Sequence, residues 1–184
     1  MTSLGVMALR MHHPLLAAGA ALLALTLATA CSPTPVPTPS PTGFASEEEA
    51  FAAAEATVRE YFEAASAIDL SDPKTFEPLF DLTTADQNAF DRKRYSEYQA
   101  EEYSITGASN VVAVQPRSWD PETQASIVDA CVDVSALDLR RADGTSVVSP
   151  DRPDKQDLQI QLAFNSGRFL IASIAGSDRP ICER

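Results

Sequence analysis

Residues 128–134, VDACVDV, alternate small apolar side chains with a second set of residues. A period of two is typical of a β-strand with one face toward the core. One face would carry Val128, Ala130, Val132 and Val134, and the other Asp129, Cys131 and Asp133. We expect the valine face to meet helices. Cys131 would point away from them, and residues 176–184 would fold back over that side.

The neighbouring segments have the same period of two, and they are separated by residues that favour turns. The strands are expected within residues 109–119, 122–137, 157–164 and 168–176. The pair Asp120-Pro121 favours a turn after the first of them. Asp143-Gly144 and Asn165-Ser166-Gly167 are hairpin signals, so the sheet is predicted to be antiparallel.

The residues before Gly107 have a helical period instead. Ser46 followed by Glu49 is a capping box, and it predicts a helix over residues 46–68. Its apolar face would comprise Phe51, Ala54, Val58, Phe62 and Ala65. Thr84 and Gln87 form a second capping-box pattern, which predicts another helix. The apolar face of that helix would run through Phe90, Arg94 and Tyr98.

Helices followed by antiparallel strands predict an α+β domain over residues 44–184, with the helices on one face of the sheet. A segment of ~140 residues is long enough to build one hydrophobic core. The chain of 184 residues has a formal charge of −12. That charge disfavours nucleic acid and anionic lipid surfaces as partners, because both are negative.

The amino terminus has the pattern of a targeting segment. Residues 15–28 are apolar or small, which is too short a run for a membrane span of about twenty residues but typical of a signal-peptide core. The run ends in LATAC, residues 27–31, which resembles the lipobox of bacterial lipoproteins. The resemblance implies a signal peptide over 1–30, acylation of Cys31 and a lipid anchor on the extracytoplasmic face of the cell membrane. The alternative is an ordinary secretory signal cut after Ala30, with Cys31 free or disulfide-bonded.

Residues 31–43 are expected to form the lipidated cysteine and a spacer. Proline stands at nearly every second position of residues 32–42, which prevents a helix or a central strand. Such a run favours an extended polyproline helix that rises ~3.1 Å per residue. The spacer would hold the domain away from the bilayer.

Two cysteines remain in the exported domain, Cys131 and Cys182. An even number of cysteines in an oxidising compartment favours a disulfide. The alternative is a pair of reactive thiols or metal ligands. A zinc site normally needs four ligands, so we expect no metal, and no sequence motif indicates a cofactor.

The sequence argues against several kinds of enzyme. His12 and His13 both precede the apolar run, so the mature chain would have no histidine for a catalytic triad. The glycines form no phosphate-binding loop. The candidates for lining a ligand pocket are Tyr61, Tyr98, Trp119, Asp129 and Asp133.

The order of elements resembles the nuclear-transport-factor-two-like superfamily, also called SnoaL-like. The resemblance rests on the long first helix, on AIDL (67–70) after it, and on the hairpins that follow. VDACVDVSAL (128–137) and the terminal ICER (181–184) are similar to small actinobacterial lipoproteins that carry such a domain. The resemblance implies a cone-shaped, cystatin-like α+β barrel with an interior pocket.

These observations favour a non-enzymatic binding or interaction domain on a membrane anchor. Its partner would be a small apolar ligand or a neighbouring envelope protein. One alternative is an enzyme of the SnoaL-like type that uses carboxylates and tyrosines. Another is an accessory domain of envelope assembly with no ligand of its own.

Overall fold

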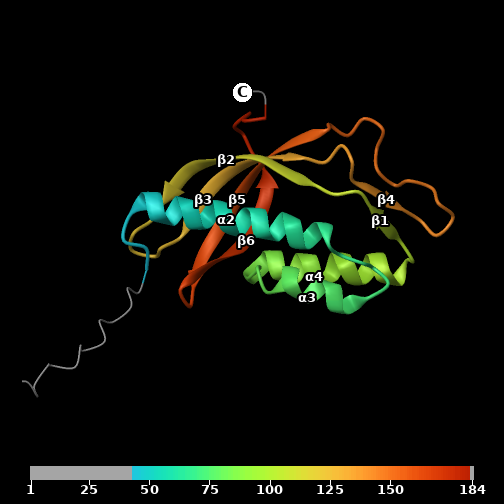
Figure 1. Cartoon of the computed structure of the whole chain (residues 1–184), viewed down its shortest axis with the longest axis horizontal. Coiled ribbons are helices and arrows are strands. Elements are labelled where there is room, and N and C mark those ends of the chain that lie inside the picture. The colour runs from blue at the N-terminus through green and yellow to red at the C-terminus, as the bar shows by residue number, and fades with distance from the viewer. Residues whose placement is uncertain (1–42, 183–184) are drawn as a thin grey trace, which may run out of the picture. The chain divides into compact units, whose positions relative to one another are not determined.

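A computed structural model describes residues 43–182 of the chain (Figure 1). The expected signal peptide, Cys31 and nearly all of the expected spacer lie outside the described residues. None of the helices within residues 43–182 has the length and apolar character that a membrane span requires.

Within the described residues, three α-helices and one short 3₁₀ helix precede the strands. They are α2 (Glu47–Ser66), the 3₁₀ helix η1 (Pro73–Phe76), α3 (Glu77–Phe80) and α4 (Ala85–Ala100). Ser46 caps α2, because its hydroxyl accepts a hydrogen bond from the Glu49 amide at 3.2 Å. The Glu49 carboxylate accepts from the amide of Ala45 at 2.9 Å. The predicted first helix and its cap are therefore confirmed.

The next helix begins where it was predicted, after Thr84, but its predicted capping box and buried face are wrong. Thr84 precedes α4, but its side chain accepts no capping hydrogen bond from the described residues. The buried face of α4 runs through Gln87, Asp91 and Tyr95, whereas Phe90 is 55% exposed. Gln87 cannot complete a capping box because its side chain turns inward to Asp91. A polar network, and not an apolar stripe, therefore orients this helix.

Four strands form an antiparallel sheet in the order β2-β3-β5-β6. The strands are β2 (Asn110–Trp119), β3 (Ser126–Asp133), β5 (Lys155–Asn165) and β6 (Arg168–Gly176). A second, two-stranded sheet pairs β1 (Ser104–Thr106) with β4 (Asp138–Arg140). Within the described residues β2 and β6 remain edge strands, so the main sheet is open and forms no closed barrel.

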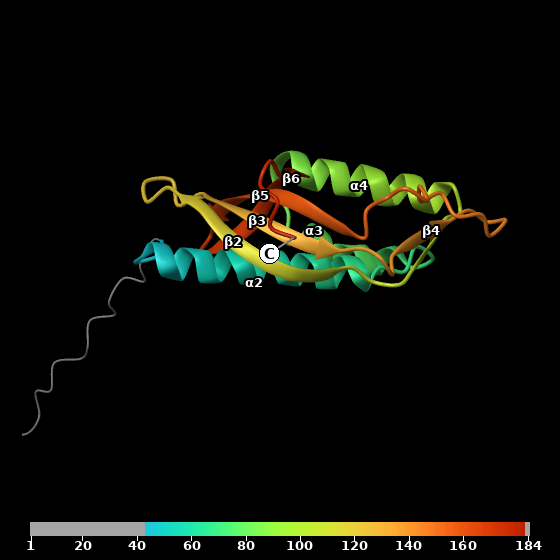
Figure 2. The ribbon, with the colours of Figure 1, turned by 90° about the horizontal axis from the view of Figure 1, so that it is seen from above.

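The core lies between the helices and one face of the sheet. Figures 1 and 2 show α2 and α4 as long helices whose axes run in a similar direction. Val128, Ala130 and Val132 of β3 are buried in the same cluster as Ala54 and Val58 of α2. The predicted valine face is confirmed, and the α+β class with it.

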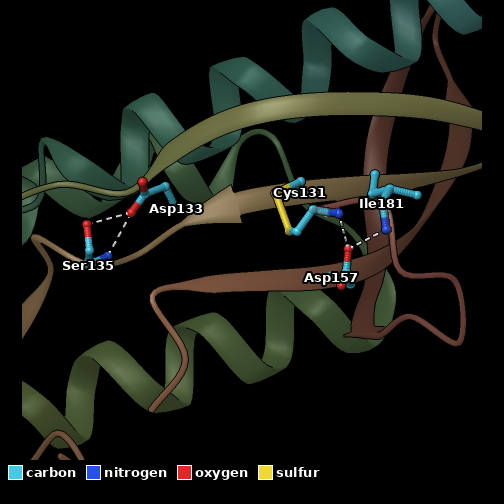
Figure 3. The surroundings of a disulfide bond; sticks show 6 residues. Cys131, Asp133, Ser135, Asp157 and Ile181 are labelled. Carbon is cyan, nitrogen blue, oxygen red and sulfur yellow. Dashed lines mark hydrogen bonds between the residues drawn. A yellow bond between two sulfur atoms is a disulfide. The ribbon is translucent and has the colours of Figure 1, made fainter. Parts of the chain in front are cut away.

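The carboxyl-terminal tail covers the opposite face of β3. Cys131 and Cys182 form a disulfide there (Figure 3). One Asp157 carboxylate oxygen accepts hydrogen bonds from the amides of Ile181 and Cys182, both at 2.8 Å. Ile181 is buried. The disulfide and these two hydrogen bonds are among the contacts that hold the tail against the sheet.

Candidate functional site

A cavity of about 310 Å³ lies beside α2 and α4 and is also lined from β1, β5 and β6. Its size is near the lower end of the ~300–1,000 Å³ range of small-molecule sites. Most of its wall is apolar, and the contributing side chains include Phe62, Ala65, Ile105, Leu137, Leu158 and Ile174. The cavity therefore suits a small ligand with an apolar body.

One end of the cavity is polar and is built mainly by α4. Tyr61 of α2 and Gln87, Arg94 and Tyr95 of α4 all line it. Asp91 lies behind them with no exposed surface. The positions of Gln87, Asp91 and Tyr95, four residues apart, put them on one side of the helix. The polar end is therefore a consequence of the helical period.

Asp91 is the centre of a hydrogen-bonded cluster. The Tyr61 hydroxyl donates to its carboxylate at 3.1 Å, and the Gln87 amide nitrogen donates at 3.0 Å. Arg94 Nη2 forms an ion pair with the same carboxylate at 2.7 Å. The Gln87 amide oxygen accepts from the backbone N–H of Ile174 at 3.1 Å, which ties α4 to β6. The buried charge is thus paired and hydrogen-bonded, as burial requires.

Burial dominates the electrostatics of this cluster. It raises the pKa of Asp91, although the hydrogen bond from Gln87, the charge of Arg94 and the hydrogen bond from Tyr61 each act to lower it. Burial, followed by the nearby Asp91 charge, raises the pKa of Tyr61 above its ordinary value. Tyr61 therefore keeps its proton at neutral pH and acts as a donor toward Asp91.

A second hollow of about 340 Å³ adjoins the cavity and shares Phe62, Ser66 and Ser109 with it. Its cation, Arg59, is already used: the guanidinium pairs with Glu55 at 2.6 Å and donates to the Val111 carbonyl at 2.9 Å. The first cavity remains the better candidate site, because only it has a buried polar cluster at one end.

The structure brings only one of the five predicted pocket residues, Tyr61, to the cavity wall. Tyr98 packs edge-on against Tyr95 and Tyr103, outside the lining. Trp119 is half-buried at the end of β2 and packs against the core. Of the three predicted aromatic residues, only Tyr61 therefore belongs to the site.

The two predicted aspartates do not line the cavity. Asp129 is fully buried and forms ion pairs with Arg117 at 3.1 Å and Arg179 at 2.8 Å. The hydroxyl of Ser177 donates to it at 2.7 Å. Asp133 accepts hydrogen bonds from Ser135 in the turn after β3 (Figure 3). The alternation of the strand explains this, because both aspartates occupy the side opposite the valine face.

Four residues of the cluster were not predicted as site residues: Gln87, Asp91, Arg94 and Tyr95. The burial of Gln87 and Asp91 was not predicted, because a helix is expected to bury its apolar residues. The available signal was two polar residues and a tyrosine spaced every fourth position on one helix. In the part of the chain from 43 to 182, no group of three or more His, Cys, Asp or Glu is placed to hold a metal ion.

The chain matches no protein-family model and no curated protein sequence. Among solved structures, it is similar to the solution NMR structure of a de novo designed β-sheet protein. The alignment has 14% sequence identity and a TM-score of 0.34, and it covers 73% of this chain and 93% of the designed chain.

Proposed function

We propose that the chain is a membrane-anchored, extracytoplasmic lipoprotein whose domain binds a small, mainly apolar ligand without catalysing a reaction. The observation that carries the binding function is the apolar cavity with a prearranged polar end formed by Tyr61, Gln87, Arg94 and Tyr95. Ligand sites typically combine apolar walls with a few convergent polar groups.

The arrangement of carboxylates favours binding over catalysis. Acid–base pairs in enzymes generally place two groups of different pKa around the reacting atoms. Of the described residues that line the cavity, none is Asp or Glu. Asp91 and Asp129 are the two carboxylates with no exposed surface between residues 43 and 182, and they belong to separate clusters on different elements. This supports a binding domain over the SnoaL-like enzyme.

The anchor and the finer fold are also part of the proposal. The apolar run before Cys31, the small residues beside it and the spacer after it support acylation. We propose that the curved sheet and its helices form the cone-shaped, cystatin-like variant of the α+β class. Mass spectrometry of the mature amino terminus tests the anchor: we expect an acylated Cys31, and an unmodified cysteine would contradict it.

A cavity-filling pair of variants tests ligand binding. Ala65 of α2 lines the cavity, whereas Ala56 of the same helix is exposed. Each is replaced by Phe in a separate variant of the full chain. Every sample also carries Cys31→Ser, so that no acyl chain is present to compete for the cavity. Binding is followed by the fluorescence of the apolar dye N-phenyl-1-naphthylamine.

We expect the dye to bind the Cys31→Ser chain and its Ala56→Phe variant alike. The Ala65→Phe variant should bind about tenfold more weakly, because the new ring occupies part of the apolar space. Circular dichroism checks that the fold is kept. Equal binding by Ala65→Phe and Ala56→Phe, or no binding by any of the three, would contradict the proposed function.

A further inference from the structure

The hydrogen-bond donors and acceptors that remain unused at the polar end of the cavity indicate the chemistry of the ligand. A guanidinium has five N–H donors and no acceptor. In Arg94, Nη2 donates to Asp91 at 2.7 Å and to the Tyr95 hydroxyl at 3.3 Å. Arg94 Nε is buried with no partner in the described structure, and Nη1 makes no hydrogen bond to residues 43–182.

Tyr95 adds a further donor. Its oxygen accepts from Arg94, but its own O–H donates to no residue within the described range. Tyr95 is buried and lines the cavity. Burial raises the pKa of Tyr95, so the hydroxyl keeps its proton at neutral pH. Arg94 and Tyr95 therefore present donors on the same end of the cavity.

The acceptors at this end are already used. Asp91 receives hydrogen bonds from Tyr61, Gln87 and Arg94, and it does not line the cavity. The Gln87 amide oxygen accepts from the Ile174 backbone. A cationic ligand would have to displace one of these bonds, and an unpartnered buried polar group costs free energy. The unused groups at this end, on Arg94 and Tyr95, are donors and favour a ligand that accepts hydrogen bonds.

We propose that the cavity selects a small apolar molecule that ends in an acceptor oxygen, a carboxylate or a carbonyl group. This inference rests on the proposed binding function and adds the class of ligand. The oxygen accepts from Arg94, whose side chain is 30% exposed and so within reach, and from Tyr95. The apolar body packs against Ile105, Leu158 and Ile174.

Three competitors with similar alkyl chains test the head group. Octanoate, 2-octanone and octylamine are each used to displace N-phenyl-1-naphthylamine from the full chain with Cys31→Ser. Octanoate or 2-octanone should displace the dye at a concentration about tenfold lower than octylamine does. The two oxygen compounds distinguish a carboxylate from a carbonyl ligand. The formal charge of −12 favours the amine non-specifically, so it works against the expected result.

A variant then assigns the preference to Arg94. Removing Arg94 alone would leave Asp91 buried without its cation, which is strongly destabilising. The test therefore uses the double variant Asp91→Asn/Arg94→Met, which removes both charges. The control is Lys93→Met, because Lys93 is on the same helix with a largely exposed side chain. We expect the preference for the stronger of the two oxygen competitors over octylamine to fall about tenfold in the double variant and to be kept in the control.

The outcomes separate the two proposals. If the dye binds and Ala65→Phe weakens it, but octylamine competes as well as the oxygen compounds, the acceptor inference is wrong and the binding function stands. The same conclusion follows if the double variant keeps the full preference. If the dye does not bind at all, the proposed function itself fails.

Discussion

Asp91 is a carboxylate with no exposed surface, held by a tyrosine, a glutamine and an arginine. Charged side chains are almost never fully buried unless they are paired. Arg94 supplies the charge, and Gln87 and Tyr61 supply further donors. Breaking such a pair by removing one partner typically costs about 3–5 kcal/mol. The cluster therefore fixes where α2, α4 and β6 meet, and it also forms the end of the cavity.

The raised pKa of Asp91 predicts how its contribution to stability depends on pH. Because its folded pKa lies above the ordinary value of 3.8, the folded chain binds this proton more tightly than the unfolded chain. The resulting stabilisation is complete below about pH 4 and is lost as the pH rises through the raised pKa. We therefore expect the free energy of unfolding of Asp91→Asn to increase relative to that of wild type as the pH rises from about 4 through the raised pKa of Asp91, measured by urea unfolding.

Asp120 provides a control of the opposite sign. Hydrogen bonds from the Glu122 amide and the Thr123 side chain lower its pKa. Its stabilisation is therefore present above about pH 4 and lost as the pH falls through the lowered pKa. Asp120→Asn should lose stability relative to wild type as the pH rises through that interval. Parallel pH profiles for the two variants would contradict this interpretation of Asp91.

At the scale of the elements, the sequence predicted β3 better than α4. The alternation in residues 128–134 identified both faces of the strand, because one face is purely apolar and meets the helices. The predicted buried face of α4 is displaced by one residue from the observed face, since Phe90 is exposed and Asp91 is buried. Periodicity assumes that apolar residues are buried. It fails where a hydrogen-bonded polar network replaces them.

The turn after β1 gives a prediction at the same scale. Gly107 has a φ of +74°, and a Cβ there would lie 1.8 Å from the Ala136 carbonyl oxygen. Gly144 has a φ of +83°, but a Cβ there would meet no described atom within 4 Å. Gly144→Ala should cost about 1–2 kcal/mol from the left-handed backbone alone. Gly107→Ala should cost clearly more, because the loop that contains Ala136 must also move.

Chemical denaturation of the two glycine variants measures the difference. Both substitutions add one methyl group at a positive φ, so the comparison isolates the contact with Ala136. Equal losses in the free energy of unfolding would contradict the close approach of the two loops.

At the scale of the whole molecule, the disulfide joins the tail to the centre of the sheet. Cys131 and Cys182 are 51 residues apart. For a loop of that length, the chain-entropy model gives a stabilisation of about 4 kcal/mol. The variant Cys131→Ser/Cys182→Ser should therefore have a clearly lower Tm in thermal unfolding. Cys31→Ser should leave the Tm unchanged, and an unchanged Tm in the double variant would contradict the structural role of the disulfide.

The sequence predicted the α+β class and the pairing of the cysteines, but not the open edges of the sheet or the position of the cavity. Closure of a barrel depends on whether β2 and β6 meet, and the period of each strand does not encode that. The cavity wall comes from β1, β5, β6 and two helices that are distant in sequence. Of the residues at the polar end of the cavity, only Tyr61 was predicted from the sequence. Its partners Gln87 and Asp91 are of residue types that are usually exposed.

Native mass spectrometry of the protein purified from its own membrane addresses the binding function without a chosen probe. We expect a species heavier than the acylated chain by the mass of one small molecule, and the loss of that species in Ala65→Phe but not in Ala56→Phe. A single species with the mass of the acylated chain alone, in wild type and in both variants, would contradict the proposal that this cavity holds a ligand.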